Sequence, residues 1–574
     1  MKSFFIVLLF AIGLAACEPA PVPTTSTTPT ISPKPAFTPT PDPRPRVLRI
    51  NLPARPDTLD PQRAFTSSEL AILQLAYEGL TRVDEQGKVH PGAAESWEFR
   101  DGGKSLVFRL RGNLKRADVA AITAKDFEFA FRYALDPRLG APTPSFLDDV
   151  RGALAAYSLD PKSRPDDIEK ILNNVGIKAV DDQRLLVSFD QPTGSWLTIA
   201  STMIGFPSDK GKIDGDPDAW WLKPENHTGN GAFKIAEIHD AFIRLIPNEN
   251  YWGEKSKLDR IEFYWQSETD ALTSYRNGEL DIVRIGMDHF AQAQADRDLV
   301  RMTAARVTYI GFNLKKPPFN DKNVRRAFSH ALDREGFVRE VLKGLGKPYV
   351  GWIPPGIPGF DDTATAPNYD PTAAVRVLID NGYGTADKKK VDCAKLGTIK
   401  LSYSNTPRTQ VLFSFIAANL TRIFACPVLL DPIEPNAFPV TVRDPRTTPQ
   451  MFLMPWEGEY PHPQNWLFLQ TCKGVYATRL GYCNKDFDAA LSAENQELDF
   501  DQAMEKYKIA QRIFVGDIAA AFLWHNENAY LVKPYVLGAR DHAGASDFAW
   551  LGQFGPLATY SIDLRQVGAG YPTQ

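Results

Sequence analysis

The protein has 574 residues, of which 43% are hydrophobic and 23% are charged, so it carries enough apolar material for a large packed core. This composition excludes a disordered, collagen-like or coiled-coil chain. With 65 Lys and Arg against 69 Asp and Glu, the net charge is −4, which gives no broad electrostatic reason to bind nucleic acid or an anionic membrane surface.

The chain begins with the pattern of an export signal. Lys2 precedes an apolar stretch at 4–16, which suits a secretory signal peptide and is shorter than the about 20 residues that span a bilayer. The sequence Leu14-Ala15-Ala16-Cys17 resembles the bacterial lipobox, in which diacylglycerol is attached to the cysteine and the chain is cut before it. A plain small-residue cleavage site is the alternative. We expect residues 1–16 to be the signal peptide and Cys17 to be lipidated.

A tether is predicted next, so that 17–46 holds the lipidated cysteine and a linker. Glu18–Arg46 contains ten Pro and seven Thr, a composition that favours an extended polyproline-like chain without a core. No later segment has the about 18 consecutive apolar residues of a spanning helix. The sequence therefore predicts a protein that is held at a membrane by acyl chains and does not cross it.

Four further cysteines suggest disulfides in an exported chain. Cys472 and Cys483 lie 11 residues apart across a Gly- and Tyr-containing loop, which makes them a plausible pair. Cys393 and Cys426 each lie beside a β-rich run and could tie neighbouring strands. Free buried thiols are the alternative. A zinc site has no support, because there is no Cys-x-x-Cys and no nearby His.

The remaining chain alternates short β-like runs with helical patterns, without a repeat. We expect a strand at 47–52, a helix at 68–79 and a half-buried strand at 104–111. Further helices are expected to begin after the N-cap residues Thr123 and Asp321. This order of elements predicts mixed α/β lobes.

Catalytic motifs are absent from the sequence. Gly103-Lys104-Ser105 looks like the end of a phosphate loop, but the earlier glycine that such a loop requires is Glu98. There is no His-Glu-x-x-His and no Gly-x-Ser-x-Gly. The sequence thus offers no positive case for an enzyme, a metal site or a cofactor.

Several stretches resemble the extracellular solute-binding proteins of bacterial ABC importers, in the class of peptide- and nickel-binding members. The matching segments are residues 58–61, 77–80, 91–97, 123–127, 134–137, 229–233, 250–253, 277–281 and 313–344. They occur in the order of the family along the chain.

The resemblance implies an α/β fold with two lobes around a cleft, able to close by hinge motion. By analogy, the lobes are built from discontinuous segments of the chain. Lobe I takes 47–91 with 225–307 and 533–574, an inserted subdomain takes 92–224, and lobe II takes 308–532.

The resemblance also implies a binding site around Trp456. In peptide-binding members a Trp at this position precedes an acid-aromatic pair, here Glu459 and Tyr460, and the acid pairs with the ligand's α-ammonium group. A buried ammonium group needs such a partner to offset its desolvation. Trp456 would form an apolar wall. Two departures stand out: Glu replaces the usual Asp, and Pro455 lacks the backbone N–H that could pair with an extended ligand. Glu457 is an alternative acid, and the alternative for Glu459 itself is a solvated loop carboxylate.

A second loop is expected across the cleft. Ala64, Phe65 and Thr66 stand where family members present a ligand-contacting loop, and their backbone amides could bind peptide carbonyls. The alternative is an ordinary loop that leads into a helix capped by Ser67 or Ser68.

Together these features predict a monomeric, extracytoplasmic receptor of the cell envelope, anchored in the membrane by lipid. It would capture oligopeptides or dipeptides and deliver them to the permease subunits of an ABC importer, without a cofactor and without nucleic acid. The alternatives are a non-peptide solute, such as a nickel chelate, an oligosaccharide, an opine or haem, or a different class altogether, a secreted hydrolase or a surface adhesin.

Overall fold

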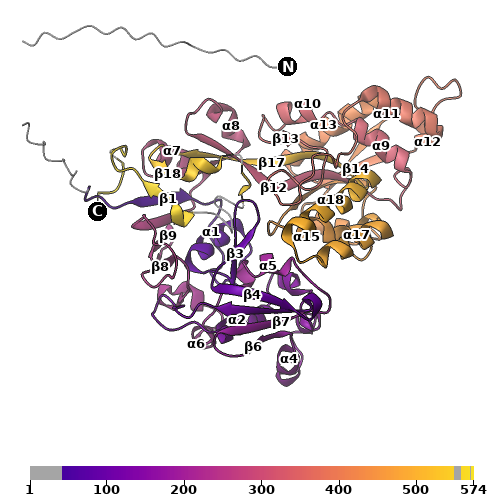
Figure 1. The fold of residues 1–574 in the computed structure, drawn as a ribbon. Helices are drawn as coiled ribbons and strands as arrows, with labels where there is room; N and C mark the ends of the chain where they lie inside the picture. Colours follow the sequence, from indigo (N-terminus) through magenta and orange to yellow (C-terminus); the bar gives the residue numbers. More distant parts are fainter. Residues whose placement is uncertain (1–41, 544, 548–556, 569, 574) are drawn as a thin grey trace, which may run out of the picture. The chain divides into compact units, whose positions relative to one another are not determined.

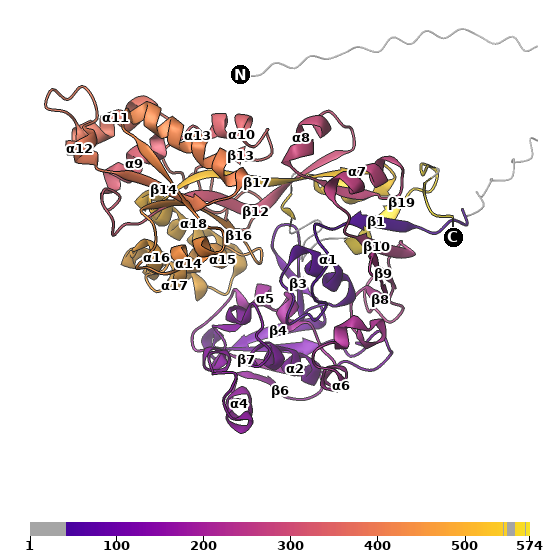
Figure 2. The same ribbon diagram turned by 180° about the vertical axis from the view of Figure 1, so that it is seen from behind.

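The computed structural model describes residues 42–543, 545–547, 557–568 and 570–573. The predicted signal peptide, Cys17 and most of the predicted tether therefore lie outside the described residues. Arg44–Gln574 forms one compact unit, and all the structural statements below concern it (Figures 1 and 2).

One long mixed sheet runs through this unit (Figure 1). Its strands, in spatial order, are β15 (Val428–Ile433), β14 (Ile399–Ser404), β16 (Met451–Glu457), β12 (Leu299–Phe312), β17 (Ala520–Val532), β11 (Ile282–Ile285), β1 (Val47–Asn51), β10 (Arg260–Tyr264), β9 (Phe242–Pro247) and β8 (Phe233–Ile238), and β13 (Lys347–Pro348) also pairs with β17. Strands from widely separated parts of the sequence thus lie side by side.

Strands β12 and β17 are the longest and connect the two halves of this sheet. Their antiparallel register runs from Leu299 opposite Leu531 to Gly311 opposite Ala520. One end of the pair is flanked by β11 and the other by β16. Most of their side chains are buried on both faces, as expected for strands that are covered on both sides.

A second sheet lies within the predicted inserted subdomain (Figure 2). Its strands, in spatial order, are β4 (Ala94–Arg100), β5 (Ser105–Leu110), β7 (Arg184–Ser188) and β6 (Ile177–Ala179). Two short pairs complete the strands, β2 (Thr81–Val83) with β3 (Val89–Pro91) and β18 (Val536–Leu537) with β19 (Ser561–Ile562).

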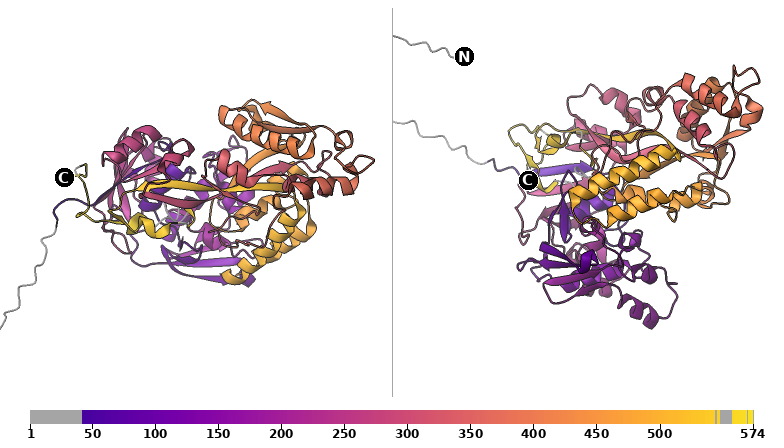
Figure 3. Two further views of the ribbon diagram at one scale, coloured as in Figure 1. Left: turned by 90° about the horizontal axis from the view of Figure 1, so that it is seen from above. Right: turned by 45° about the vertical axis from the view of Figure 1, so that its right-hand side comes forward.

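Helices pack along both sheets, and α17 lies beside α18 (Figure 3). The α-helices are α1 (Ser67–Ala76), α2 (Ala124–Ala134), α3 (Ala153–Tyr157), α4 (Pro165–Leu172), α5 (Trp196–Ile199), α6 (Lys210–Gly215), α7 (Glu268–Arg276), α8 (Met287–Ala293), α9 (Lys322–His330), α10 (Arg334–Glu340), α11 (Pro371–Leu378), α12 (Cys393–Leu396), α13 (Pro407–Phe424), α14 (Ala437–Arg443), α15 (Gln464–Leu467), α16 (Val475–Leu480), α17 (Lys485–Asn495) and α18 (Phe500–Asp517). Within the described ranges, none of them is both long and apolar enough to cross a membrane.

The predicted elements are present with small shifts at their ends. The strands expected at 47–52 and 104–111 are β1 and β5, and the helix expected at 68–79 is α1, which ends earlier, at Ala76. Thr123 and Asp321 cap α2 and α9 as expected. The cap of α1 is Thr66 rather than Ser67 or Ser68. The Thr66 hydroxyl accepts from the Glu69 amide, and the Glu69 carboxylate accepts from the Thr66 amide.

Both cysteine pairs form disulfides. Cys393–Cys426 connects the start of α12 to the segment before β15, with a Cα–Cα distance of 5.4 Å. Cys472–Cys483 closes the loop around α16, with a Cα–Cα distance of 4.4 Å. The covalent links therefore lie in the half of the sheet that contains β14–β16.

A buried ion pair connects β1 to two later parts of the chain. The Arg49 guanidinium donates to both carboxylate oxygens of Asp281, at 2.7 and 3.1 Å, and the Arg49 amide donates to the same carboxylate at 2.7 Å. The Tyr535 hydroxyl also donates to Asp281, at 2.7 Å. Neither charged side chain is more than 5% exposed. Since each lone pair has a donor, the cost of burying this carboxylate is offset locally.

We expect Asp281→Ala to lower the free energy of unfolding by about 3 to 5 kcal/mol, because it leaves the Arg49 guanidinium buried without its partner. The matched control is Asp240→Ala, which removes an exposed carboxylate that pairs with Arg55 at the surface and should leave stability nearly unchanged. Urea unfolding followed by tryptophan fluorescence measures both. Equal midpoints for the two variants would contradict this account.

Candidate functional site

A cavity of about 300 Å³ lies where β12 and β17 lose their regular pairing. It is lined by residues from each segment to which the sequence assigned a lobe or the insertion. They are Asn51, Leu52, Pro53, Phe65, Ser67, Leu70, Ala71, Thr143, Phe146, Met203, Arg284, Ala304, Ala305, Arg306, Glu457, Gly458, Glu459, Asn526, Asn528, Tyr530 and Asp547.

A bulge in β12 forms part of the wall. Thr303 pairs with Glu527 and Val307 with His525, so that three residues of β12, 304–306, stand opposite Asn526 alone. All four of these residues line the cavity. A bulge interrupts the ladder and re-aims side chains.

Both backbone groups of Ala305, in the middle of the bulge, have hydrogen-bond partners. The Ala305 amide donates to the Asp547 carboxylate at 3.0 Å. The Ala305 carbonyl accepts from the Gly458 amide at 2.7 Å. The bulge therefore connects the loop after β16 to the segment that contains Asp547.

Asp547 is held in this position by a second donor, the Asn528 side chain, at 2.8 Å. Burial raises the pKa of Asp547 to about 6, and the nearby Glu457 charge adds to the shift, while the Ala305 amide, Arg284 and Asn528 oppose it. A carboxyl group at the cavity wall thus changes its charge near neutral pH.

Glu459 is the second carboxylate at this end. Its backbone amide donates to the Asn465 side chain at 2.8 Å, and the Asn465 amide group donates back to the Glu459 carboxylate at 3.3 Å. Partial burial raises the pKa of Glu459, and Asn465 opposes the shift. Since Asn465 is itself fully buried, it acts as a positioning residue that orients Glu459 toward the cavity.

A neighbouring cavity of about 380 Å³ shares part of the same wall, and the charged residues that line it are three arginines and two glutamates, Glu268 and Glu527. Arg284 and Arg306 border both cavities, and Arg408 at the start of α13 borders only the second. Arg306 lies 3.8 Å from Glu457. Arg408 makes no ion pair with any carboxylate in the described part of the chain. Its guanidinium group donates a hydrogen bond to the Met287 sulfur. Below, the part of the first cavity around Glu459 and Asp547 is called the acidic end, and the part of the second cavity around Arg408 is called the basic end.

The loop expected across the cleft contributes one of its three predicted residues. Phe65 is 61% exposed and lines the cavity. Ala64 is buried and Thr66 caps α1, and neither lines it. The expectation that these amides bind peptide carbonyls is wrong, because the amides of Phe65 and Thr66 donate to Glu69 at 2.8 and 2.9 Å, and that of Ala64 donates to the Asp60 carbonyl.

Trp456 and Tyr460 stand behind the cavity wall. Trp456 packs edge-to-face against Tyr476, with ring centroids 5.7 Å apart, and is not a lining residue, since its side chain alternates with that of Glu457 along β16. Tyr460 is buried and packs edge-to-face against Phe146, which does line the cavity. Tyr460 thus supports Phe146 in the wall.

Sequence reasoning did not find Asn465, Asp547 or the three arginines. Asn465 lies six residues after Glu459, and only the turn between them brings the two side chains together. Asp547 and Arg284 belong to no local motif. The sequence around Asp547 gives no indication that this carboxylate lines a cavity, because its partners come from distant parts of the chain.

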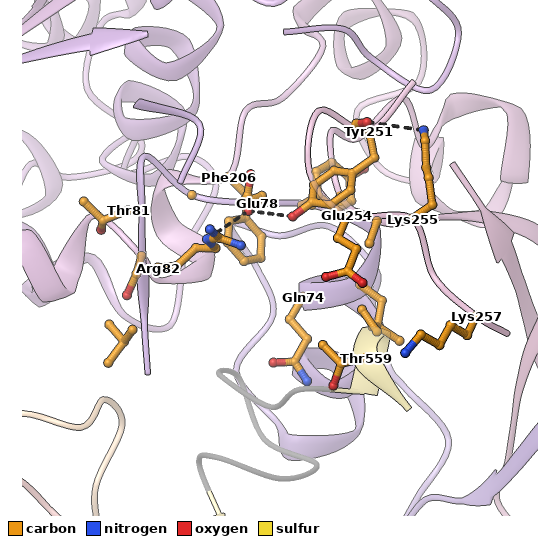
Figure 4. Close-up of a pocket in the computed structure, with 18 residues that line it drawn as sticks. Gln74, Glu78, Thr81, Arg82, Phe206, Tyr251, Glu254, Lys255, Lys257 and Thr559 are labelled. Atoms are coloured by element: carbon orange, nitrogen blue, oxygen red, sulfur yellow. Dashed lines mark hydrogen bonds and ion pairs between the residues drawn. The ribbon is translucent and has the colours of Figure 1, made fainter. Parts of the chain in front are cut away.

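A separate cavity of about 450 Å³ lies beside α1 and the segment after β9 (Figure 4). Its most buried charged residue is Glu78, which accepts from the Tyr251 hydroxyl at 3.0 Å and from the Trp252 ring, and lies 3.6 Å from Arg82. Burial raises the pKa of Glu78. Because protein groups already occupy this carboxylate, the cavity offers less to a charged ligand than the one at the bulge.

Comparison with curated proteins finds relatives along most of the chain. It is 27% identical over 522 residues to the dipeptide-binding protein DppE of Bacillus subtilis, covering 88% of this chain and 91% of that protein. It is also 27% identical over 506 residues to the probable deoxycholate-binding periplasmic protein YgiS of Escherichia coli, covering 86% and 90%. Relatives named for chemically different solutes are therefore equally similar to it.

Solved structures share the fold. The unliganded open form of the murein tripeptide-binding protein MppA matches with a TM-score of 0.75 and 23% identity, covering 90% of this chain and 97% of that one. Haemophilus influenzae OppA in complex with the peptide RPPGFSPFR matches with a TM-score of 0.63 and 23% identity, covering 90% and 98%. The fold is accordingly the α/β fold of these periplasmic binding proteins.

Residues 88–476, more than half of the chain, match the middle region of the bacterial extracellular solute-binding proteins of family 5. The predicted resemblance is confirmed, and the hydrolase alternative is set aside, because this family consists of receptors that bind solutes rather than of enzymes. The chain belongs to the bacterial extracellular solute-binding proteins, family 5.

Proposed function

We propose that this protein is a lipid-anchored receptor that binds peptides in the paired cavities at the β12 bulge and delivers them to an ABC importer. The single observation that carries the proposal is the charge arrangement of these cavities: Glu459 and Asp547 line only the first cavity and Arg408 lines only the second, while Arg284 and Arg306 border both. A peptide has an ammonium group at one end and a carboxylate at the other. The names of relatives, among them dipeptide- and oligopeptide-binding proteins, support the same solute class.

The acidic end suits an ammonium group. Closing a cleft removes water from a cation, and a carboxylate that accepts its hydrogen bonds offsets that cost. Glu459 is already partly desolvated and oriented by Asn465, so that binding requires little reorganisation of this side chain. We therefore assign Glu459 as the principal partner of the ligand's α-ammonium group, with Phe65 as an apolar neighbour.

The basic end suits a carboxylate. A guanidinium group can donate two parallel hydrogen bonds to a carboxylate, which fixes its orientation. Arg408 is exposed at the edge of the second cavity and makes no ion pair with a carboxylate elsewhere in the described residues, whereas Arg306 lies near Glu457. Arg408 is the side chain best placed to receive the ligand's carboxylate.

Ligand capture requires motion between two lobes, and the strand pairing supports the predicted division. The assigned boundary at 307/308 falls at the end of the β12 bulge. On β17 the residue opposite the bulge is Asn526, which lies within the strand. The lobe boundary assigned from sequence, 532/533, lies at the end of that strand. We propose the bulge as the hinge and 92–224, with its own sheet, as the inserted subdomain.

The proposed location is extracytoplasmic, at the membrane of the cell envelope. The support comes from the sequence at 1–46, with its export signal, its lipobox-like Leu14–Cys17 and its Pro- and Thr-rich tether. Several of the relatives are named as periplasmic proteins. A tether keeps the receptor near a permease while leaving it free to turn.

We expect Glu459→Gln to weaken the binding of trialanine by more than about tenfold, because the ligand's ammonium group loses its charged partner. The matched control is Glu457→Gln, which neutralises the neighbouring carboxylate at the same wall. It should cost less, because Glu457 already lies 3.8 Å from Arg306, whereas Glu459 is oriented by Asn465. Isothermal titration calorimetry measures both. Equal losses, or a loss only for Glu457→Gln, would assign the ammonium partner to Glu457 instead.

Binding of trialanine should weaken as the pH is lowered from about 7.5 to about 5. A bound ammonium group favours the ionised carboxylate, so affinity is complete above the pKa of the empty site and is lost as the pH falls through it. Burial raises the pKa of both Asp547, to about 6, and Glu459. Calorimetry on Asp547→Asn should show weaker binding at the higher pH and a flatter profile. A wild-type affinity that does not change over this range would contradict the assignment.

Cys17→Ser should move the protein from the membrane fraction to the soluble fraction and abolish its labelling by radioactive palmitate in the bacterial host, because acyl chains provide the anchor. Ala20→Ser, which changes a tether residue, serves as the control and should keep both properties. Fractionation followed by immunoblotting measures the outcome. A Cys17→Ser protein that stays with the membrane would show that another feature holds it there.

A further inference from the structure

One edge of β16 is open beside the cavity. On its other side β16 pairs with β12 along its whole length, from Phe312 opposite Met451 to Arg306 opposite Glu457. Its pairing with β14 includes only Met451 and Phe452. Over the described part of the chain, no strand pairs with residues 453–457 on this edge. The edge therefore presents backbone groups that a bound chain could use.

The hydrogen bonds at both ends of β16 fix which residues face this edge. The Gly458 amide donates to the Ala305 carbonyl, and the Asn313 amide donates to the Gln450 carbonyl. Because antiparallel pairs alternate between bonded and non-bonded, the even-numbered residues from 450 to 458 bond to β12. The odd-numbered residues 453, 455 and 457 direct their backbone groups to the open edge.

Pro455 is thus one of the residues that face the edge. It is exposed and lies opposite Thr308 at a non-bonded position of the β12 ladder. Its missing N–H costs the fold no ladder bond, which is why a proline is tolerated in this strand. The loss falls entirely on the open side, where Pro455 offers a carbonyl acceptor and no donor.

The open edge continues from the ammonium site. Glu459 and Glu457 line the cavity, and Pro455 follows Glu457 along the strand in the direction away from Glu459. A peptide whose ammonium group is held at Glu459 and whose backbone pairs with this edge first meets the Glu457 amide and carbonyl. Alternate ligand residues pair with a strand, so a third or fourth residue is needed to reach Pro455.

We propose that Pro455 sets the length selectivity of the receptor and makes it a receptor for dipeptides and similarly short peptides. The proposal rests on the proposed peptide-binding function. Ligand residues beyond those beside Glu457 bring a carbonyl next to the proline ring, where closure removes water without supplying a donor. A peptide long enough to reach Pro455 therefore leaves one of its carbonyls buried without a donor and binds more weakly than a dipeptide.

The test is Pro455→Ala, which restores the N–H at an exposed position, measured by calorimetry with dialanine and tetraalanine. We expect the wild-type protein to bind dialanine about fivefold more tightly than tetraalanine, because a carbonyl of the longer peptide loses water beside Pro455 without gaining a donor. The variant should bind tetraalanine about fivefold more tightly, the value of one net hydrogen bond, and dialanine unchanged. Pro455→Gly, which restores the same donor, should show the same length-dependent gain.

Pro432→Ala is the matched control, because Pro432 is also an exposed proline in an edge strand of the same sheet, paired with Tyr403 in β14, and it does not line either cavity. It should change neither affinity. Unchanged tetraalanine binding in both Pro455 variants, or an equal gain for both peptides, would overturn the role of Pro455 while leaving peptide binding intact. Failure of the wild-type protein and every variant to bind any peptide would overturn the proposed function and this inference with it.

Discussion

The pairing of β12 with β17 is the constraint on which the rest of the structure depends. These strands cross from one half of the sheet to the other, and the bulge at 304–306 interrupts their ladder where both halves meet. The cavity lies at this interruption, and Ala305 there bonds to Asp547 and Gly458. The proposed ligand site and the proposed hinge thus depend on the same departure from regular pairing.

The charged groups around the bulge are held in place by neutral amides. Asn465 orients Glu459 and Asn528 orients Asp547. Burial raises the pKa of both carboxyl groups, and the two amides oppose that shift. Perturbed carboxyl groups in a cavity are a common feature of functional sites, which is why the proposed ammonium site is placed here.

Local patterns predicted the elements well. The capping pairs at Thr123 and Asp321 and the alternating strand β5 depend on residues a few positions apart, and these were placed correctly from sequence. The site was predicted less completely. Phe65 and Glu459 lie at the cavity as expected, but the amides of the 64–66 loop are taken by Glu69, and Trp456 lies behind the wall. A family pattern gives a residue's position in the chain, whereas the direction of its side chain depends on the neighbours that tertiary packing supplies.

The sequence by itself determined the family, the α/β fold class, the export and lipidation pattern and the motif that contains Glu459. Each of these depends on residues that lie close together in the chain. Only the tertiary structure decided what surrounds Glu459. It brought Arg284 and Asp547 to the cavity that Glu459 lines, placed Asn465 against Glu459, and set the strand register that turns Pro455 toward an open edge. The physical reason is that charge complementarity and hydrogen-bond direction are properties of groups within a few ångströms of one another, and residues that far apart in a chain meet only when the sheet has formed.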